Sequence, residues 1–325
     1  MGSQLQEELK GLEVFKVKKP ELLVTPKKVD EIVPLIEAGA DAFIIGEQKF
    51  GLRLAGDFSR EEVKEAIALA HQHGKKVYVA MNAIFHNELV EEIGEYLTFA
   101  SEAGADAVVY GDPAVLMMAK EFAPSMKLHW NTETTATNWH TCNYWGRKGS
   151  KRAVLARELS MDAIVETKEH AEVEIEVQIH GMTCMFQSKR SLLGNYFEYQ
   201  GKALKIENRD QEEAMFLFDP ERDNKYPIFE DANGTHIMSP NDMCIIDELG
   251  EMIDAGIDSF KIDGILQTSE YILDVTKKYR LAIDTYIADQ DKYEEIKEGL
   301  LSEIEELQAK NRPLDTGFFF KETVY

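Results

Sequence analysis

Short apolar runs alternate along this chain with longer segments in which apolar residues recur at helical spacing. This alternation is typical of β/α units, in which a buried parallel strand is followed by an amphipathic helix. Glycine or polar residues close most of the apolar runs, so each run predicts one short strand. We expect strands at residues 21–24, 41–45, 76–81, 107–110, 128–131, 153–156, 174–179 and 259–262.

The segments between these strands have helix boundary signals. Ser59 is placed as an N-cap, with Glu61 and Glu62 in the first turn, where the helix dipole favours acidic side chains. Pro113 suits the first position of a helix, and Ser160 is a further N-cap. We expect helices at residues 26–38, 59–74, 87–103, from 113, from 137 or 138 to 146, from 160, and at 242–255.

About eight β/α units within roughly 250 residues predict a closed, TIM-like (β/α)8 barrel. A doubly wound open sheet is the alternative, because the number of strands alone does not prove closure. No G-x-G-x-x-G motif follows the first strand, which disfavours a dinucleotide-binding fold. We expect an N-terminal extension at residues 1–18, the barrel at 19–290, and a C-terminal helix and tail at 291–325.

Two segments interrupt the β/α rhythm. Residues 185–236, after strand seven, contain polar, turn-rich stretches and no clear β/α unit, so we interpret them as an insertion. Residues 291–311 form a charged helix with Ile296, Leu300 and Ile304 at helical spacing. That helix either packs on the barrel wall or docks a partner.

Composition excludes several classes of protein. Of the 325 residues, 44% are hydrophobic, which supports a full core, and the formal net charge is −23. Such a charge argues against an electrostatic grip on nucleic acid by this chain alone. No apolar run is long enough to span a membrane, and we expect no signal peptide because the first residues lack a basic segment followed by an apolar one. Its three widely spaced cysteines fit a reducing cytoplasm, so we expect a cytoplasmic protein.

Polar residues are concentrated where the predicted strands end. In a barrel these ends meet at one face, where the loops after the strands form the functional site. We expect a substrate-binding role for six of these residues: Glu47, Arg53, Asn82, Asn131, Lys261 and Asp263. Arg53 suits a carboxylate or phosphate through its planar guanidinium, although a structural tie within its loop is an equal alternative.

Four further residues are candidates for a catalytic role. His180 ends strand seven just before Gly181 and is either a catalytic group or a core histidine. By alternation, Glu176 points to the same side as His180. It either orients His180, binds a ligand or forms a structural ion pair in the lumen. Arg157 and Glu158 follow a buried strand and act at the barrel mouth or form a surface pair.

The residues give little support for metal or hydrolytic chemistry. Cys142, Cys184 and Cys244 have no C-x-x-C spacing, so we expect no metal site. The sequence contains neither a G-x-S-x-G nor a helix-borne H-E-x-x-H motif. A peptidase would have to be of an unrecognised type.

Several motifs, in order, resemble the collagenase-like peptidase (U32) family, which also contains tRNA and ubiquinone hydroxylation proteins. They are GEQKFGLRLAG at 46–56, NAIFHN at 82–87, RAVLARELS at 152–160, EVQIHG at 176–181 and DAGIDSFKIDG at 254–264. The resemblance covers residues 19–284 and is greatest to a short subgroup without an iron–sulfur cluster.

Longer members of this family hold an iron–sulfur cluster with four cysteines. Cys184 stands where the first of these is expected, but Ser191 replaces the second, and no cysteine lies between Cys184 and Cys244. A cluster normally requires four thiolates. The resemblance therefore implies that this chain binds no iron–sulfur cluster and no other stoichiometric cofactor.

The resemblance implies an enzyme, or a subunit of one, for 5-hydroxylation of the tRNA wobble uridine with prephenate as co-substrate. The alternatives are a collagenase-like peptidase and a non-catalytic partner of a cluster-bearing paralogue. The expected partners are that paralogue and tRNA, the latter bound through a complex, with a homodimer left open and no membrane association.

Overall fold

The structure is a computed structural model that describes residues 18–202 and 215–321. In these residues, eight parallel strands close into a barrel because β13 pairs with both β1 and β7. The predicted TIM-like barrel is confirmed, and the open-sheet alternative is wrong. The barrel strands are β1 (Glu21–Val24), β2 (Ala42–Ile45), β3 (Lys76–Met81), β4 (Ala107–Tyr110), β5 (Leu128–Trp130), β6 (Ser150–Val154), β7 (Glu174–Gly181) and β13 (Ser259–Ile262).

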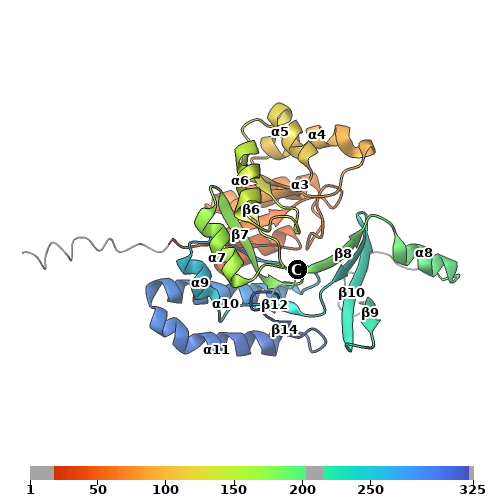
Figure 1. Cartoon of the computed structure of the whole chain (residues 1–325). Coiled ribbons are helices and arrows are strands. Elements are labelled where there is room, and N and C mark those ends of the chain that lie inside the picture. The colour runs from red at the N-terminus through yellow and green to blue at the C-terminus, as the bar shows by residue number, and fades with distance from the viewer. Residues whose placement is uncertain (1–17, 203–214, 322–325) are drawn as a thin grey trace, which may run out of the picture.

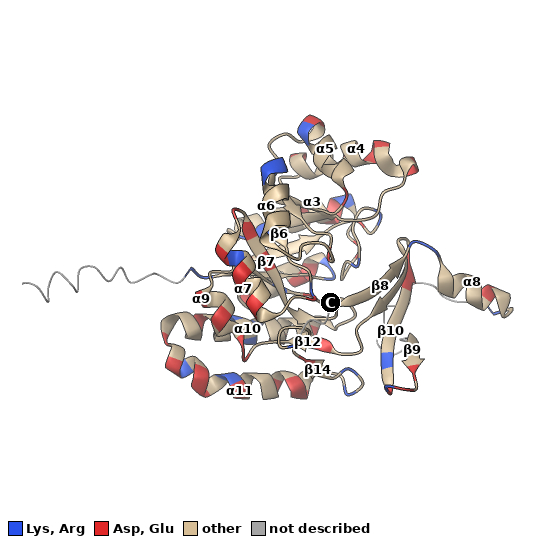
Figure 2. Ribbon diagram, in the orientation of Figure 1, with Lys and Arg blue, Asp and Glu red and all other residues tan. Residues whose placement is uncertain are grey.

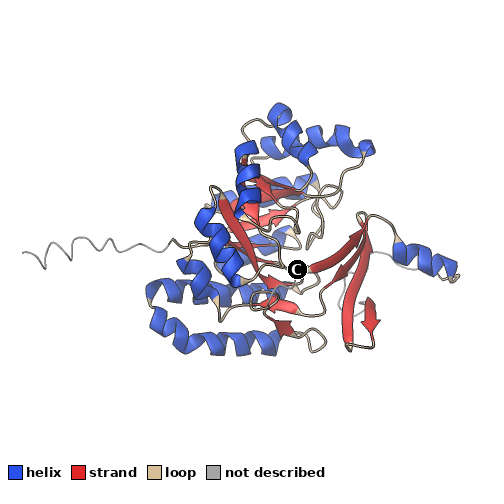
Figure 3. Ribbon diagram, in the orientation of Figure 1, coloured by secondary structure: helices blue, strands red, loops and turns tan. Residues whose placement is uncertain are grey.

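Helices surround the barrel (Figures 1 and 3). They are α2 (Ile32–Glu37), α3 (Arg60–Gln72), α4 (Val90–Glu102), α5 (Pro113–Phe122), α6 (Trp139–Lys148), α7 (Met161–His170), α9 (Leu249–Asp254), α10 (Ser269–Ala288) and α11 (Gln290–Leu307), with 3-10 turns at Val29–Glu31 and Asn87–Leu89. The predicted caps at Ser59, Asn138 and Ser160 each accept a backbone hydrogen bond. None of the helices in the described ranges is long and apolar enough to cross a membrane.

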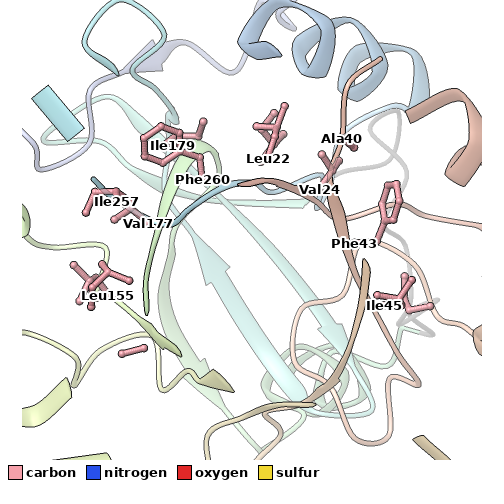
Figure 4. Packing of buried hydrophobic residues seen from close by; sticks show 14 of the residues in the cluster. Leu22, Val24, Ala40, Phe43, Ile45, Leu155, Val177, Ile179, Ile257 and Phe260 are labelled. Carbon is pink, nitrogen blue, oxygen red and sulfur yellow. The ribbon is translucent and has the colours of Figure 1, made fainter. Parts of the chain in front are cut away.

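Two layers of apolar side chains hold the barrel together. The outward residues of the strands, such as Phe43, Ile45 and Phe260, pack against the helices (Figure 4). Inward residues, among them Leu23, Ile44 and Val109, form a separate cluster inside the lumen. The period of two along each strand thus assigns alternate residues to the outer and inner layers.

The segment after strand seven is a small antiparallel sheet beside the barrel (Figure 1). It consists of β8 (Cys184–Ser188), β9 (Met215–Asp219), β10 (Asn224–Asp231) and β11 (Gly234–Met238), and helix α8 (Leu192–Tyr199) follows β8. The sequence predicted no regular units in this insertion, and the sheet was missed. Its strands are short and end in turns, so their apolar alternation is weak.

Three further boundaries differ from the sequence-based expectation. Strand six was expected at 153–156 but occupies Ser150–Val154. Of the helix expected at 242–255, only the second part is helical, as α9. The first part forms β12 (Asp242–Cys244), which pairs antiparallel with β7. The tail adds β14 (Leu314–Asp315) parallel to β12. The N-terminal extension predicted at 1–18 lies almost entirely outside the described residues.

Candidate functional site

The barrel mouth contains an open cavity of about 420 Å³ between the barrel loops and strand β8. Beneath it lies a smaller enclosed space of about 20 Å³, room for roughly one water molecule. Leu52, Arg53, Asn82, Asn131 and Glu133 line both spaces. The two spaces therefore share a wall at the carboxyl ends of the strands, where the site of this fold is expected.

Five charged residues form a connected ion cluster under the cavity. Arg53 is hydrogen-bonded to Glu133 through Nη2 and Oε2. Nη2 of Arg157 lies 3.6 Å from Oε1 of Glu133 and 3.8 Å from Oδ2 of Asp263. Nζ of Lys261 donates to the same Asp263 oxygen at 2.9 Å. Three cations thus face two carboxylates, and the cluster has one positive charge in excess.

Electrostatics within the cluster keep Glu133 ionised. Burial by itself would raise the pKa of Glu133, but the charges of Arg53, Arg157 and Lys261 lower it to about 2. Burial opposes the charge of Arg53 as well, yet Glu133 raises the pKa of its guanidinium. The Arg53–Glu133 pair is consequently charged throughout the physiological pH range. The cluster contrasts with the acidic residues spread over the outer helices, as along α11 (Figure 2).

Backbone geometry at this pair is unusual. Arg53 has a φ of 49° and Glu133 a φ of 64°, both in the left-handed region that non-glycine residues rarely adopt. Such residues each cost on the order of 1 kcal/mol or more and cluster at functional sites. Here they bring together two side chains that are 80 positions apart in the sequence.

The insertion docks on the same arginine. Nη1 of Arg53 donates to Oε1 of Gln187 at 3.2 Å and lies 3.4 Å from Nδ1 of His236. Nδ2 of Asn233 donates to the carbonyls of Gln48 and Gly51. Arg53 therefore lines the site and ties the small sheet to the barrel, which is a structural role, while its role in binding a carboxylate or phosphate stays a prediction.

The two predicted asparagines lie in the floor of the cavity. Oδ1 of Asn82 accepts from the backbone N–H of Leu52 at 2.9 Å. Oδ1 of Asn131 accepts from the backbone N–H of Glu133 at 3.0 Å. Both side chains are buried, and each holds the loop that presents one member of the Arg53–Glu133 pair.

The structure separates His180 from this site. The pairing of β13 with β7 shifts register after Lys261, so that Ile262 lies opposite His180. Because Ile262 belongs to the outer core layer, His180 also points outward, towards α10. Its Nε2 lies 2.9 Å from the Tyr271 hydroxyl. Burial lowers the pKa of His180 to about 4, so the side chain is a neutral, packed histidine.

Glu176 lies at the opposite end of the lumen. It accepts a hydrogen bond from Arg152 at 3.2 Å, and Arg152 also pairs with Glu21 and Glu174. The expectation that Glu176 and His180 share a side is wrong, because the β-bulge reverses the alternation between them. Glu176 is instead in the structural ion pair that the sequence analysis gave as its alternative role.

Two other predicted residues lie away from the ion cluster. Glu47 pairs with Arg60 at the start of α3, at 3.1 Å. Glu158 is exposed just after Arg157. The structure thus brings together Arg53, Asn82, Asn131, Arg157, Lys261 and Asp263. It adds Glu133, which follows β5 two positions after Asn131 and was open to the same strand-end rule, and Gln187 and His236, which required knowledge of the insertion's pairing to find.

The cysteines do not fit an iron–sulfur cluster. Cys184 lines the open cavity, and burial raises the pKa of its thiol. Cys244 is buried beside Tyr279 on the outer side of β7, and Cys142 is buried in α6. Within the described ranges, no group of three or more His, Cys, Asp or Glu side chains is arranged to hold a metal ion.

Sequence relatives cover nearly the whole chain. It is 69% identical over 309 residues to tRNA hydroxylation protein P2 of Bacillus subtilis (strain 168), covering 95% of this chain and 100% of that protein. It is 33% identical over 308 residues to tRNA hydroxylation protein P1 of the same strain, covering 93% of this chain and 71% of that protein.

Structural likeness confirms the fold alone. A monomeric dihydrodipicolinate synthase variant superposes with a TM-score of 0.51 at 10% identity, covering 93% of this chain and 86% of the other. The sequence model of peptidase family U32 matches residues 27–324. The resemblance inferred from the sequence motifs is thereby confirmed, and the chain belongs to peptidase family U32.

Proposed function

We propose that this protein acts in 5-hydroxylation of the wobble uridine of tRNA, as the enzyme or as a subunit of it. Support comes from the two tRNA hydroxylation proteins to which nearly the entire chain is similar. The high identity to protein P2 extends over the complete length of that relative. A shared function is therefore better supported than one taken from the fold.

The observation that best supports a co-substrate site is the ion cluster under the open cavity. Arg157 is almost buried, yet its contacts to Glu133 and Asp263 are longer than hydrogen bonds. Arg157 lines the small space under the open cavity, so it adds positive charge to the cavity floor without being held by a hydrogen bond among the described residues. A small dicarboxylate such as prephenate has the complementary charge, and charge-assisted bonds in a partly dry site are strong.

A partner is part of the proposal. The net charge of −23 leaves the chain poorly suited to hold tRNA phosphates by itself. A cluster-bearing paralogue would supply both the basic surface and the iron–sulfur chemistry, and a non-catalytic supporting role in that complex is the second candidate. We propose that the hydroxylation takes place in the cytoplasm and that this chain binds no stoichiometric cofactor.

Proteolysis has less support from the geometry. Cys184 has a raised thiol pKa, which disfavours the thiolate that a nucleophile requires. His180 is buried on the outer side of β7 against Tyr271 and does not face the cavity. The word peptidase therefore describes the family and not a site identified in this chain.

The deciding experiment is deletion of the gene, followed by mass spectrometry of nucleosides from total tRNA. We expect 5-hydroxyuridine and its derivatives to fall and a plasmid copy to restore them. A strain unable to make prephenate should show the same loss. Unchanged hydroxyuridine in a strain that lacks this gene and its paralogue would refute the proposed function.

A further inference from the structure

The floor of the open cavity presents an unusual set of hydrogen-bond donors. The Oδ1 atoms of Asn82 and Asn131 are engaged by the backbone N–H groups of Leu52 and Glu133. Those bonds fix which way each amide faces, so the Nδ2 amino groups are the free ends. Across the described part of the chain, neither amino group has a hydrogen-bond partner, although the side chains are only 8% and 3% exposed.

Two more donors in the same wall lack partners. Nε2 of Gln187 and Nε of Arg53 are buried and unpaired within the described ranges, while the other polar atoms of these side chains are hydrogen-bonded. Buried donors are nearly always paired, and an unpaired one costs roughly 1 to 3 kcal/mol. Because both atoms are closed off from the cavity, they add positive potential to its wall and do not contact a ligand directly.

The rim of the cavity has a different chemistry. Ile84 from the barrel, and Met185 and Phe186 from strand β8, line it. They are 49%, 59% and 47% exposed, which is high for large apolar side chains. Such a rim over a polar floor suits a flat ring that stacks on Phe186 and turns its polar edge inward.

We propose that this cavity receives the uracil base, flipped out of the RNA, with its carbonyl oxygens accepting from Asn82 and Asn131. This inference rests on the proposed function and names the residues that would select its substrate. Uracil offers two carbonyl acceptors, whereas cytosine replaces one of them with an amino donor. The amino group of cytosine would face the amino group of Asn82 or Asn131. Two hydrogen-bond donors would then oppose each other, so we expect the site to reject cytosine. A cavity of about 420 Å³ is large enough for one base.

Aspartate substitutions test the role of the amino groups separately from loop structure. Asn82→Asp and Asn131→Asp keep the oxygen that accepts from Leu52 or Glu133, replace the Nδ2 donor with an acceptor oxygen and add one negative charge, as Asn138→Asp also does. Asn138→Asp is the matched control, because Asn138 caps α6 through its oxygen and does not line the cavity. Phe186→Ala tests the rim at an exposed position, where the fold does not depend on the side chain.

The probes are the uncharged nucleosides uridine and cytidine, titrated by saturation-transfer NMR up to tens of millimolar. We expect the wild type to bind uridine about tenfold more tightly than cytidine, the two Asp variants and Phe186→Ala to lose about tenfold, and Asn138→Asp to be unchanged. No uridine binding, equal binding of the two nucleosides, or unaltered binding by both Asp variants would overturn the inference.

The same variants are then introduced into the deletion strain. If the wild-type gene restores hydroxyuridine but Asn82→Asp and Asn131→Asp restore it equally well, the base site is wrong while the proposed function stands. If the wild-type gene restores nothing, the proposed function fails, and the nucleoside titration still decides the base site. Thermal melting of each purified variant identifies any that do not fold.

Discussion

Nη2 of Arg157 lies 3.6 Å from Oε1 of Glu133, within reach of electrostatic attraction but beyond a hydrogen bond. The same nitrogen is 3.8 Å from Asp263, so Arg157 sits between two carboxylates without being fixed by either. Arg53, by contrast, is hydrogen-bonded to Glu133 and Gln187, and its Nη1 lies 3.4 Å from Nδ1 of His236. The cluster thus pairs an anchored arginine with one that makes no hydrogen bond within the described residues and lines the small space under the cavity.

Arg157→Ala should therefore abolish hydroxyuridine formation in cells and leave the fold intact. Arg53 and Lys261 still compensate Glu133 and Asp263, so we expect a loss of stability of only about 1 kcal/mol. Modified-nucleoside levels and thermal melting are measured together, with the exposed Arg147→Ala as control. Normal modification, or a loss explained by unfolding, would mean that Arg157 is structural.

Arg53→Ala should reduce stability far more. It leaves Glu133 without its hydrogen-bonded cation and breaks the contact between the barrel and the small sheet, so we expect a cost on the order of 3 kcal/mol. Urea unfolding measures this cost, and limited proteolysis reports whether the insertion is loosened. A melting temperature equal to that of the wild type would show that the sheet is held by other contacts.

Local pattern was sufficient to predict most of the fold. The barrel strands are short apolar runs, and the caps at Ser59 and Ser160 depend on residues three positions apart, so both are visible in sequence. The six predicted residues that do meet at the mouth follow from one rule, that parallel strands end at the same face.

What could not be predicted depends on pairing between distant segments. The direction of His180 is set by a bulge opposite Ile262, some eighty positions later. Gln187 and His236 reach Arg53 only because β8 and β11 pair and pack over the mouth. Neither relationship leaves a periodic signal in the sequence.

The buried His180 predicts a specific pH dependence of stability. Its pKa is about 4 in the folded protein, below the ordinary value of 6.5, so the unfolded chain binds the proton first. Stability is complete above pH 6.5 and falls as the pH decreases towards 4. Between pH 7 and pH 5 this side chain should account for roughly 2 kcal/mol of lost stability.

His180→Gln cannot titrate, so its urea unfolding free energy should change less over the same pH interval. The exposed His73→Gln serves as control and should follow the wild type. Glu133 does not interfere, since its lowered pKa affects stability only below about pH 4.5. Equal pH slopes for His180→Gln and the wild type would show that His180 is not buried in its neutral form.

The purified protein should have no gelatinase or caseinase activity. The cavity holds a thiol whose pKa is raised by burial, and it lacks an adjacent histidine among the described residues that line it. Activity is measured before and after a second purification step. Proteolysis that persists and disappears in Cys184→Ser would contradict this expectation, whereas activity that fades with purification indicates a contaminant.

The purified protein should also be colourless and free of stoichiometric iron. A cluster requires about four thiolates in one place, and here Cys184 lines the cavity while Cys142 and Cys244 are buried in other elements. Raised thiol pKa values at Cys142 and Cys244, both about 11, further disfavour metal binding.

Iron content and absorbance near roughly 400 nm after anaerobic purification test this, since cluster charge-transfer bands fall there. Cys184→Ser should leave both readings at baseline. A band that appears in the wild type and vanishes in Cys184→Ser would show that this cysteine retains a cluster, with further ligands from a second subunit.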